Sequence, residues 1–259
     1  MNLKIISTEL LEAYLEQVDQ NLQVKFEALQ DAPISTDTFS FYTSVASVFS
    51  SKIEGEEIDL DSYVKHKKFG VSFSPDYTRK IDDLYDAYRY AQTHALNRDH
   101  ISEAHRLLSR HLLAPHHQGK LRTQNMYVST SDGKIEYVAV SPFDLLQEME
   151  KFYHDLEVLI GAEMSLPEVF YFAAQLHLVF VKIHPWTDGN GRAARLIEKW
   201  FLSQKLGPQA WYVQSEKHYY RNHMGYYNAI RALGLEYEQL DYGNALPFLR
   251  MLMEAVGEG

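Results

Sequence analysis

Apolar and polar residues follow one another along most of this chain with the spacing of amphipathic helices. Between residues 76 and 97, for example, Ile81, Leu84, Tyr85 and Tyr88 fall on one helical face. Helical spacing recurs in the segments 8–30, 38–54, 76–97, 101–113, 142–160, 167–183 and 191–205. The remainder, to Gly259, also has a helical pattern with many tyrosines. The chain is therefore predicted to be mainly α.

Several of these helices carry end signals in the sequence. Asp31-Ala32-Pro33 should end the first helix and Gly55 the second. Ser165 and Glu168 have the spacing of a capping box, with Pro167 early in the helix. Gly207-Pro208 should stop the helix that begins near residue 191.

Residues 119–142 break the helical pattern. Met126-Tyr127-Val128 and Ile135-Glu136-Tyr137-Val138 are rich in β-branched and aromatic residues, and Asp132-Gly133 between them is a strong turn signal. One β-hairpin is therefore expected inside a helical protein.

Composition narrows the class of protein. The chain has 259 residues, 46% of them hydrophobic, a formal net charge of −10 and no cysteine. Disulfides, thiolate nucleophiles and thiolate metal sites are excluded, and the acidic balance argues against nucleic acid as a partner. The N-terminus lacks the apolar stretch of a signal peptide, and no run approaches the roughly 18 apolar residues that cross a membrane. A soluble, cytoplasmic protein is expected.

The strongest chemical signal lies between residues 184 and 195. Pro185 disfavours helical geometry at His184, so the preceding helix should end there. Gly189-Asn190-Gly191 then leads into a new helix, whose first N–H groups and dipole favour an anion. The local pattern predicts a phosphate-binding loop.

Charged and titratable residues around this loop extend the prediction. Arg192 and Arg195 oppose the helix dipole, and a bound anion would account for them. Asp188 can hold Mg²⁺ together with substrate phosphates, and His184 can accept a proton near neutral pH.

This stretch resembles the signature of the Fic (Fic/Doc) family, His-x-Phe-x-(Asp/Glu)-Gly-Asn-Gly-Arg-x-x-Arg. It matches at every specified position except Trp186, which stands where the family usually has Phe. The resemblance implies a Fic-type helical core at residues 96–205 with the hairpin as its flap. It also implies an N-terminal helical region at 1–95 and a C-terminal helical extension at 206–259.

The resemblance implies a role for each matching residue. His184 would be the general base that activates a Ser, Thr or Tyr hydroxyl of a target protein for attack on the α-phosphate of ATP. Asp188 would bind Mg²⁺, and Arg195 would engage the γ-phosphate. The remaining residues would hold the phosphates, as an anion nest at Gly189, Asn190 and Gly191 and as a phosphate ligand at Arg192.

Two further segments acquire a meaning from the family. The 119–142 hairpin would hold the target protein by strand pairing. Tyr226, Tyr227 and Asn222 resemble the aromatic and polar residues that surround the adenine of ATP in the family.

A second motif, Ser50-Ser51-Lys52-Ile53-Glu54-Gly55, resembles the inhibitory motif of family members that carry an N-terminal inhibitory helix. Ser50 and Glu54 lie one turn apart on one helical face, and Gly55 fits the left-handed position that ends a helix. A carboxylate at a helix C-terminus is disfavoured, and a salt bridge from Glu54 to Arg195 would compensate it. That bridge would take the place of the γ-phosphate.

These features predict a Mg²⁺- and ATP-dependent protein adenylyltransferase that is autoinhibited by Glu54. A hydrolase that uses Glu54 to remove AMP shares the same residues. Transfer of UMP, phosphocholine or a phosphoryl group, a non-catalytic interaction module and a DNA-binding regulator are weaker alternatives. A homodimer is possible. His177 lies inside an apolar helix and is expected to be a hydrogen-bonded core residue.

Overall fold

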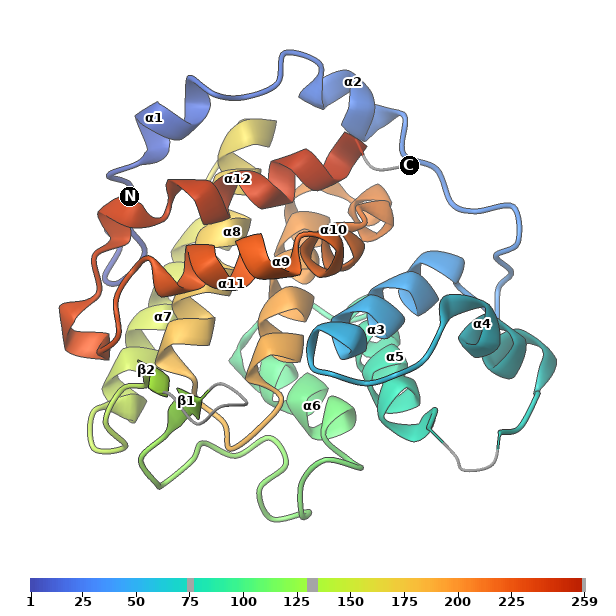
Figure 1. The fold of residues 1–259 in the computed structure, drawn as a ribbon. Helices are drawn as coiled ribbons and strands as arrows, with labels where there is room; N and C mark the ends of the chain where they lie inside the picture. Colours follow the sequence, from blue (N-terminus) through green and yellow to red (C-terminus); the bar gives the residue numbers. More distant parts are fainter. Residues whose placement is uncertain (74–76, 130–134, 258–259) are drawn as a thin grey trace.

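The computed structural model describes residues 1–73, 77–129 and 135–257 (Figure 1). Its centre is a pair of helices, α8 (Leu166–Ile183) and α9 (Asn190–Leu206), joined by the predicted loop and packed against each other. The predicted capping box opens α8, where the Ser165 N–H donates to Glu168 Oε2 at 2.7 Å. Gly207 ends α9 as expected. The mainly helical fold is confirmed.

The other helices surround this pair. α3 (Phe41–Ile53) packs against α5 (Arg79–Ala91) and α10 (Ser215–Arg221), on the right of Figure 1. Short helices α1 (Leu11–Leu15) and α2 (Leu22–Glu27) run along the top of Figure 1, over α8 and the C-terminal end of the chain. The remaining α-helices are α4 (Leu60–Phe69), α6 (Arg98–Leu108), α7 (Leu145–Gly161), α11 (His223–Arg231) and α12 (Leu246–Glu254). One hydrophobic cluster draws residues from the N-terminal, central and C-terminal parts of the chain.

Helix α8 corrects one expectation from the sequence. It is 18 residues long with a mean hydropathy of 1.3, so by length and composition it could cross a membrane. In this fold 78% of it is buried against other helices, as in the central helix of a folded domain. Because its neighbours bury it on all sides, the helix lacks the polar face of a surface helix.

The N-terminal third differs from the prediction in two places. Residues 8–30 form two short helices rather than one, because the chain turns between Glu16 and Asn21 to follow the protein surface. Helix α4 was not expected. Asp59 caps it by accepting the Ser62 N–H at 2.8 Å, and Gly70 ends it at φ 69°.

The hairpin is present as β1 (Tyr127–Ser129) and β2 (Ile135–Val138), antiparallel, with a register irregularity at Val128/Ser129. The expected turn at Asp132-Gly133 lies outside the described residues. Strand β2 is tied to the C-terminal part, since the Val138 N–H donates to the Leu235 carbonyl at 2.8 Å. The hairpin thus stands beside α8 and α11 (Figure 1).

Candidate active site

His184 ends helix α8 in a left-handed conformation, with φ 54° and ψ 61°. Among the described residues it is the one non-glycine residue with positive φ. Its Nδ1–H donates to the Val181 carbonyl at 3.1 Å, which leaves the lone pair of Nε2 available. Burial lowers the pKa of His184 to about 4, so the imidazole is neutral at physiological pH. A neutral, oriented imidazole is the form that a general base needs.

Asn190 closes the loop that follows. Its Oδ1 accepts the Trp186 N–H at 2.9 Å and its Nδ2 donates to the Trp186 carbonyl at 2.8 Å. Gly189 supplies the left-handed turn before α9, at φ 82°. The side chain of Asn190 therefore shapes the loop, while the first N–H groups of α9 face the site without helical partners.

His105, on α6, is a loop-shaping residue that the sequence analysis did not identify. It stacks on Trp186 with ring centroids 3.7 Å apart. Its Nε2–H donates to the Asp188 carbonyl at 2.9 Å, and its Nδ1 accepts the Gly119 N–H at 2.9 Å. His105 thus joins the 184–195 loop to the beginning of the flap segment. The Trp186 ring, in place of the family Phe, is accommodated beneath it and is 1% exposed.

Burial of His105 predicts a pH dependence of stability. Burial lowers the pKa of the His105 imidazole from 6.5 to about 4. At pH values below about 6.5, the unfolded chain therefore binds a proton at this residue that the folded chain does not. The free energy of unfolding should therefore fall as the pH decreases from about 6.5 towards 4. Urea denaturation of His105→Gln should show a smaller decrease between about pH 7 and pH 5 than the wild type. His116→Gln, at an exposed histidine, is the control, and equal slopes for His105→Gln and wild type would contradict the assignment.

Asp188 and Arg192 form the polar edge of the loop. Asp188 Oδ1 accepts the Gly189 N–H at 2.6 Å and lies 3.1 Å from Arg192 Nη2, and the Asp188 side chain is 50% exposed. Arg192 Nε is buried with no hydrogen-bond partner. An unpartnered guanidinium nitrogen at a helix N-terminus fits an anion such as phosphate.

Asp188 is the carboxylate that could hold Mg²⁺ at this loop. No group of three or more His, Asp or Glu that could hold a metal ion occurs among the described residues. A metal at Asp188 would therefore need further oxygen ligands, which nucleotide phosphates and water provide. One exposed carboxylate beside an anion site fits this mode of Mg²⁺ binding.

Glu54 and Arg195 form the ion pair that the family resemblance implies. Arg195 Nη2 lies 2.6 Å from Glu54 Oε1, with the Arg195 side chain 1% exposed and that of Glu54 27%. Ser50 joins them, because its Oγ accepts from Arg195 Nε at 2.8 Å and its carbonyl accepts from Nη2 at 3.1 Å. Gly55 ends α3 at φ 91°, as expected. The end of α3 is thereby fixed to the first turns of α9.

The carboxylate of Glu54 lies in the anion site itself. A Cβ atom at Gly191 would overlap Glu54 Oε1. Burial alone would raise the pKa of Glu54, but the guanidinium groups of Arg195 and Arg192 hold it below its usual value. The carboxylate is therefore ionised, and it offsets the cations that gather at the positive end of α9.

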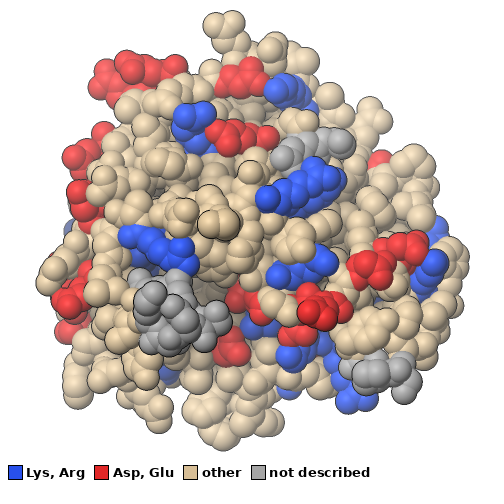
Figure 2. All heavy atoms as spheres, in the orientation of Figure 1, with Lys and Arg blue, Asp and Glu red and all other residues tan. Residues whose placement is uncertain are grey.

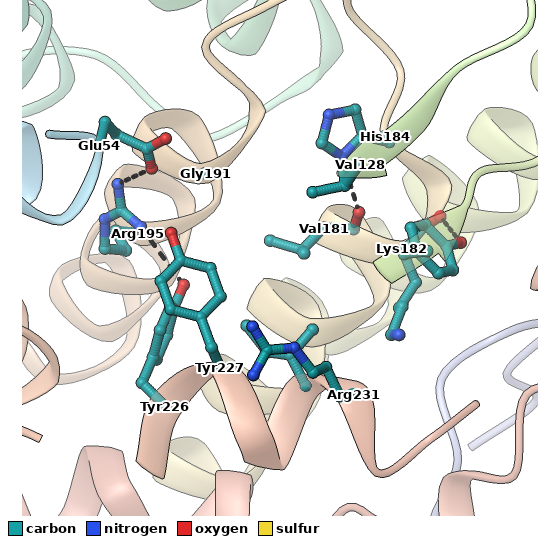
Figure 3. A pocket seen from close by; sticks show the side chains of 12 residues that line it. Glu54, Val128, Val181, Lys182, His184, Gly191, Arg195, Tyr226, Tyr227 and Arg231 are labelled. Carbon is teal, nitrogen blue, oxygen red and sulfur yellow. Dashed lines mark hydrogen bonds and ion pairs between the residues drawn. The ribbon is translucent and has the colours of Figure 1, made fainter. Parts of the chain in front are cut away.

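A pocket opens between these groups (Figure 3). Figure 3 shows Glu54, Arg195 and Tyr226 on one side of it and His184 on the other. Tyr226 and Tyr227, which the family resemblance assigns to the adenine wall, both line this pocket. Asn222 instead donates to the His218 carbonyl at 3.1 Å, and it is not among the lining residues. The walls that the sequence analysis missed are Val128, Tyr137, Val181, Lys182, Ile230 and Arg231.

Arg122 holds the flap against the loop. Its side chain is buried and donates to the carbonyls of His184 at 2.7 Å, Gln124 at 2.8 Å and Val140 at 2.6 Å. A lone arginine in an irregular segment gives no periodic signal, so sequence patterns do not reveal it.

On the face shown in Figure 2, basic side chains stand among acidic ones rather than in one broad basic surface.

The chain was compared with known proteins. A model of the Fic/DOC family matches residues 95–202. The protein adenylyltransferase Fic of Nematostella vectensis is 29% identical over 154 residues, which is 60% of this chain and 31% of that protein. A uridine 5'-monophosphate transferase of Xanthomonas campestris pv. campestris is 37% identical over 95 residues, 36% of this chain and 18% of that protein. The matches thus span about a third or less of these relatives, which are nucleotidyltransferases.

Solved structures share the fold. A Fic family protein from Desulfovibrio desulfuricans G20 superimposes with a TM-score of 0.72 at 20% identity, over 92% of this chain and 72% of that one. A Fic domain-containing protein from Bacteroides thetaiotaomicron gives a TM-score of 0.68 at 17% identity, over 91% and 92%. Together with the matched loop, these findings establish that residues 95–202 of this chain form a domain of the Fic/DOC family.

Proposed function

We propose that this protein transfers AMP from ATP to a hydroxyl group of a target protein, and that Glu54 restrains the reaction. The observation that carries the proposal is a neutral imidazole facing an anion site across one pocket. His184 is the base, and the first turn of α9 with Arg192 and Arg195 holds the phosphates. The names of the relatives, adenylyltransferases and a UMP transferase, support transfer of a nucleotide.

In the proposed transfer of AMP, each functional group of the site has one role. The target hydroxyl gives its proton to His184 Nε2 while its oxygen forms a bond to the α-phosphorus. The bond from that phosphorus to the bridging oxygen breaks, and pyrophosphate leaves with the electron pair. Mg²⁺ bound by Asp188 and the phosphates would offset their negative charge. The α9 N–H groups and Arg192 stabilise charge that develops at the reacting phosphate.

The restraint follows from competition for Arg195. The carboxylate of Glu54 lies 2.6 Å from Arg195 Nη2, on the side of Arg195 that we expect a γ-phosphate to use, and two anions at one guanidinium group would repel each other. ATP bound alongside Glu54 would then adopt a pose unsuited to in-line attack. The flap would present the target through the edge of β1 that β2 does not cover, where Tyr127 is 60% exposed. The proposal places this activity in the cytoplasm, in a monomer or homodimer.

The direct test is mass spectrometry of cell lysate treated with ATP and Glu54→Gly protein. Peptides that carry an added AMP on Ser, Thr or Tyr are expected, and Glu54→Gly/His184→Ala is the matched control. If the same modified peptides arise with both proteins, or with neither, the proposed function is wrong.

Removal of AMP is the second candidate, because ionised Glu54 lies beside the anion site and could orient a water molecule. Wild-type protein incubated with a target that has been modified by Glu54→Gly protein would then release free AMP. Release by the wild type but not by Glu54→Gly favours this direction of the reaction.

A further inference from the structure

Arg195 is held from two opposite sides (Figure 3). On one side Ser50 and Glu54, both from the end of α3, accept from its Nε and Nη2 atoms. On the other side Nη1 donates to the hydroxyl oxygen of Tyr226, on α11, at 3.3 Å. The two sets of contacts come from different helices, so the loss of one does not require the loss of the other.

The Tyr226 contact continues into the protein core. Tyr226 Oη lies 3.0 Å from His177 Nε2, and His177 Nδ1 lies 2.6 Å from Glu198 Oε2. Tyr219 also donates to Glu198 Oε2, at 2.8 Å. Tyr226 is 1% exposed, and His177 and Glu198 are fully buried. We call Tyr226, His177 and Glu198 the relay.

Hydrogen-bond chemistry fixes the direction of the relay. A guanidinium group can only donate, so Tyr226 Oη must accept from Arg195. The carboxylate of Glu198 can only accept, so His177 Nδ1 carries a hydrogen and donates it to Glu198 Oε2. In the neutral imidazole Nε2 then has a lone pair, which accepts the Tyr226 O–H. Glu198 thus selects the histidine tautomer that turns the Tyr226 O–H away from Arg195 and leaves a lone pair of Tyr226 Oη for Arg195 Nη1.

The relay ends at a buried acidic residue on α9, the helix that also carries Arg195. Glu198 lies three residues beyond Arg195 on α9, on the same face of the helix. The other oxygen of Glu198, Oε1, is buried without a hydrogen-bond partner, which is a costly arrangement for a residue whose only role is packing. When Glu54 leaves, Glu198 stays in the core, because its contacts are with His177 and Tyr219 and not with α3.

We propose that the relay is a second anchor, which keeps Arg195 aimed at the γ-phosphate site when Glu54 withdraws. His177 and Glu198 are then positioning residues, since they act on the nucleotide through Tyr226 and Arg195. This inference rests on the proposed function, because it assumes that Arg195 binds ATP. It predicts that the relay has little effect while Glu54 holds Arg195 and a large effect after Glu54 is removed.

A double-mutant cycle tests the second anchor. In Glu54→Gly protein, Glu198→Gln should weaken ATP binding measured by calorimetry about tenfold, and raise KM for ATP with little change in kcat. In protein that retains Glu54, the same change should alter the Kd for ATP by no more than about twofold. Tyr171→Phe is the control, since it removes a buried hydroxyl on α8 that donates to the Ser7 carbonyl at 2.9 Å, outside the relay. It should leave ATP binding unchanged in both backgrounds.

The outcomes separate the two proposals. If Glu54→Gly protein binds ATP and transfers AMP, but Glu198→Gln has equal effects in both backgrounds, the second anchor is wrong and the function stands. If Glu54→Gly protein neither binds ATP nor transfers AMP, both are wrong. Nitrogen-15 NMR of His177 in the wild type needs no substitution and decides the matter if Glu198→Gln does not fold. A protonated Nδ1 with a bare Nε2 supports the relay, and a protonated Nε2 overturns it.

Discussion

Replacement of His184 by alanine is expected to lower the rate of AMP transfer about 10²–10⁴-fold, the usual contribution of a general base. The substitution removes the side chain that is expected to take the proton of the target hydroxyl. The phosphate-binding groups on α9 are untouched, so the affinity for ATP should change little. The rate is measured in Glu54→Gly protein with labelled ATP, and affinity is measured by calorimetry.

The backbone at position 184 calls for a second variant. His184 has φ 54°, a left-handed conformation that costs alanine about 1–2 kcal/mol, whereas asparagine tolerates it. His184→Asn therefore tests the loss of the base with less backbone strain. Transfer by His184→Asn within about tenfold of the parent rate would rule out His184 as the base.

Replacement of Glu54 by glycine is expected to raise AMP incorporation about 10- to 100-fold, the range of typical couplings between competing ligands. The change removes the carboxylate that lies in the anion site and frees Arg195 Nη2 for the γ-phosphate. Auto-modification with labelled ATP measures the effect without knowledge of the physiological target.

Glu56→Gly is the matched control for this prediction. Glu56 lies two residues further on and pairs with Lys80 at 2.6 Å, away from Arg195. It should leave incorporation at the wild-type level. Unchanged incorporation in Glu54→Gly protein, or an equal rise in Glu56→Gly protein, would remove the case for restraint by Glu54.

The loop could be predicted from the sequence because its shape is determined by adjacent residues. Pro185 limits the conformation of His184, Gly189 supplies a left-handed turn, and the helix that follows places Arg192 and Arg195 one turn apart. The same holds for Glu54, since its place at the end of α3 follows from Gly55 and from the spacing to Ser50. Only its partner, Arg195, required the family resemblance.

Other parts of the site depend on contacts between distant segments, which local patterns do not record. His105 lies on the apolar face of α6, and its link to Asp188 arises only when α6 packs beside the loop. The contacts of Arg122, and the place of Lys182 in the pocket wall, depend on how the flap packs against the helices. Helix α4 has a weak apolar pattern, although Asp59 and Gly70 carried its end signals.

The most direct measurement of the central claim uses ATP labelled on either the α- or the γ-phosphate. Glu54→Gly protein is incubated with each form, and the label that remains on protein after denaturation is counted. Nucleotide transfer predicts that the α-label is retained on protein and that the γ-label is released in pyrophosphate. Retention of the γ-label, or retention of neither label, would contradict the account.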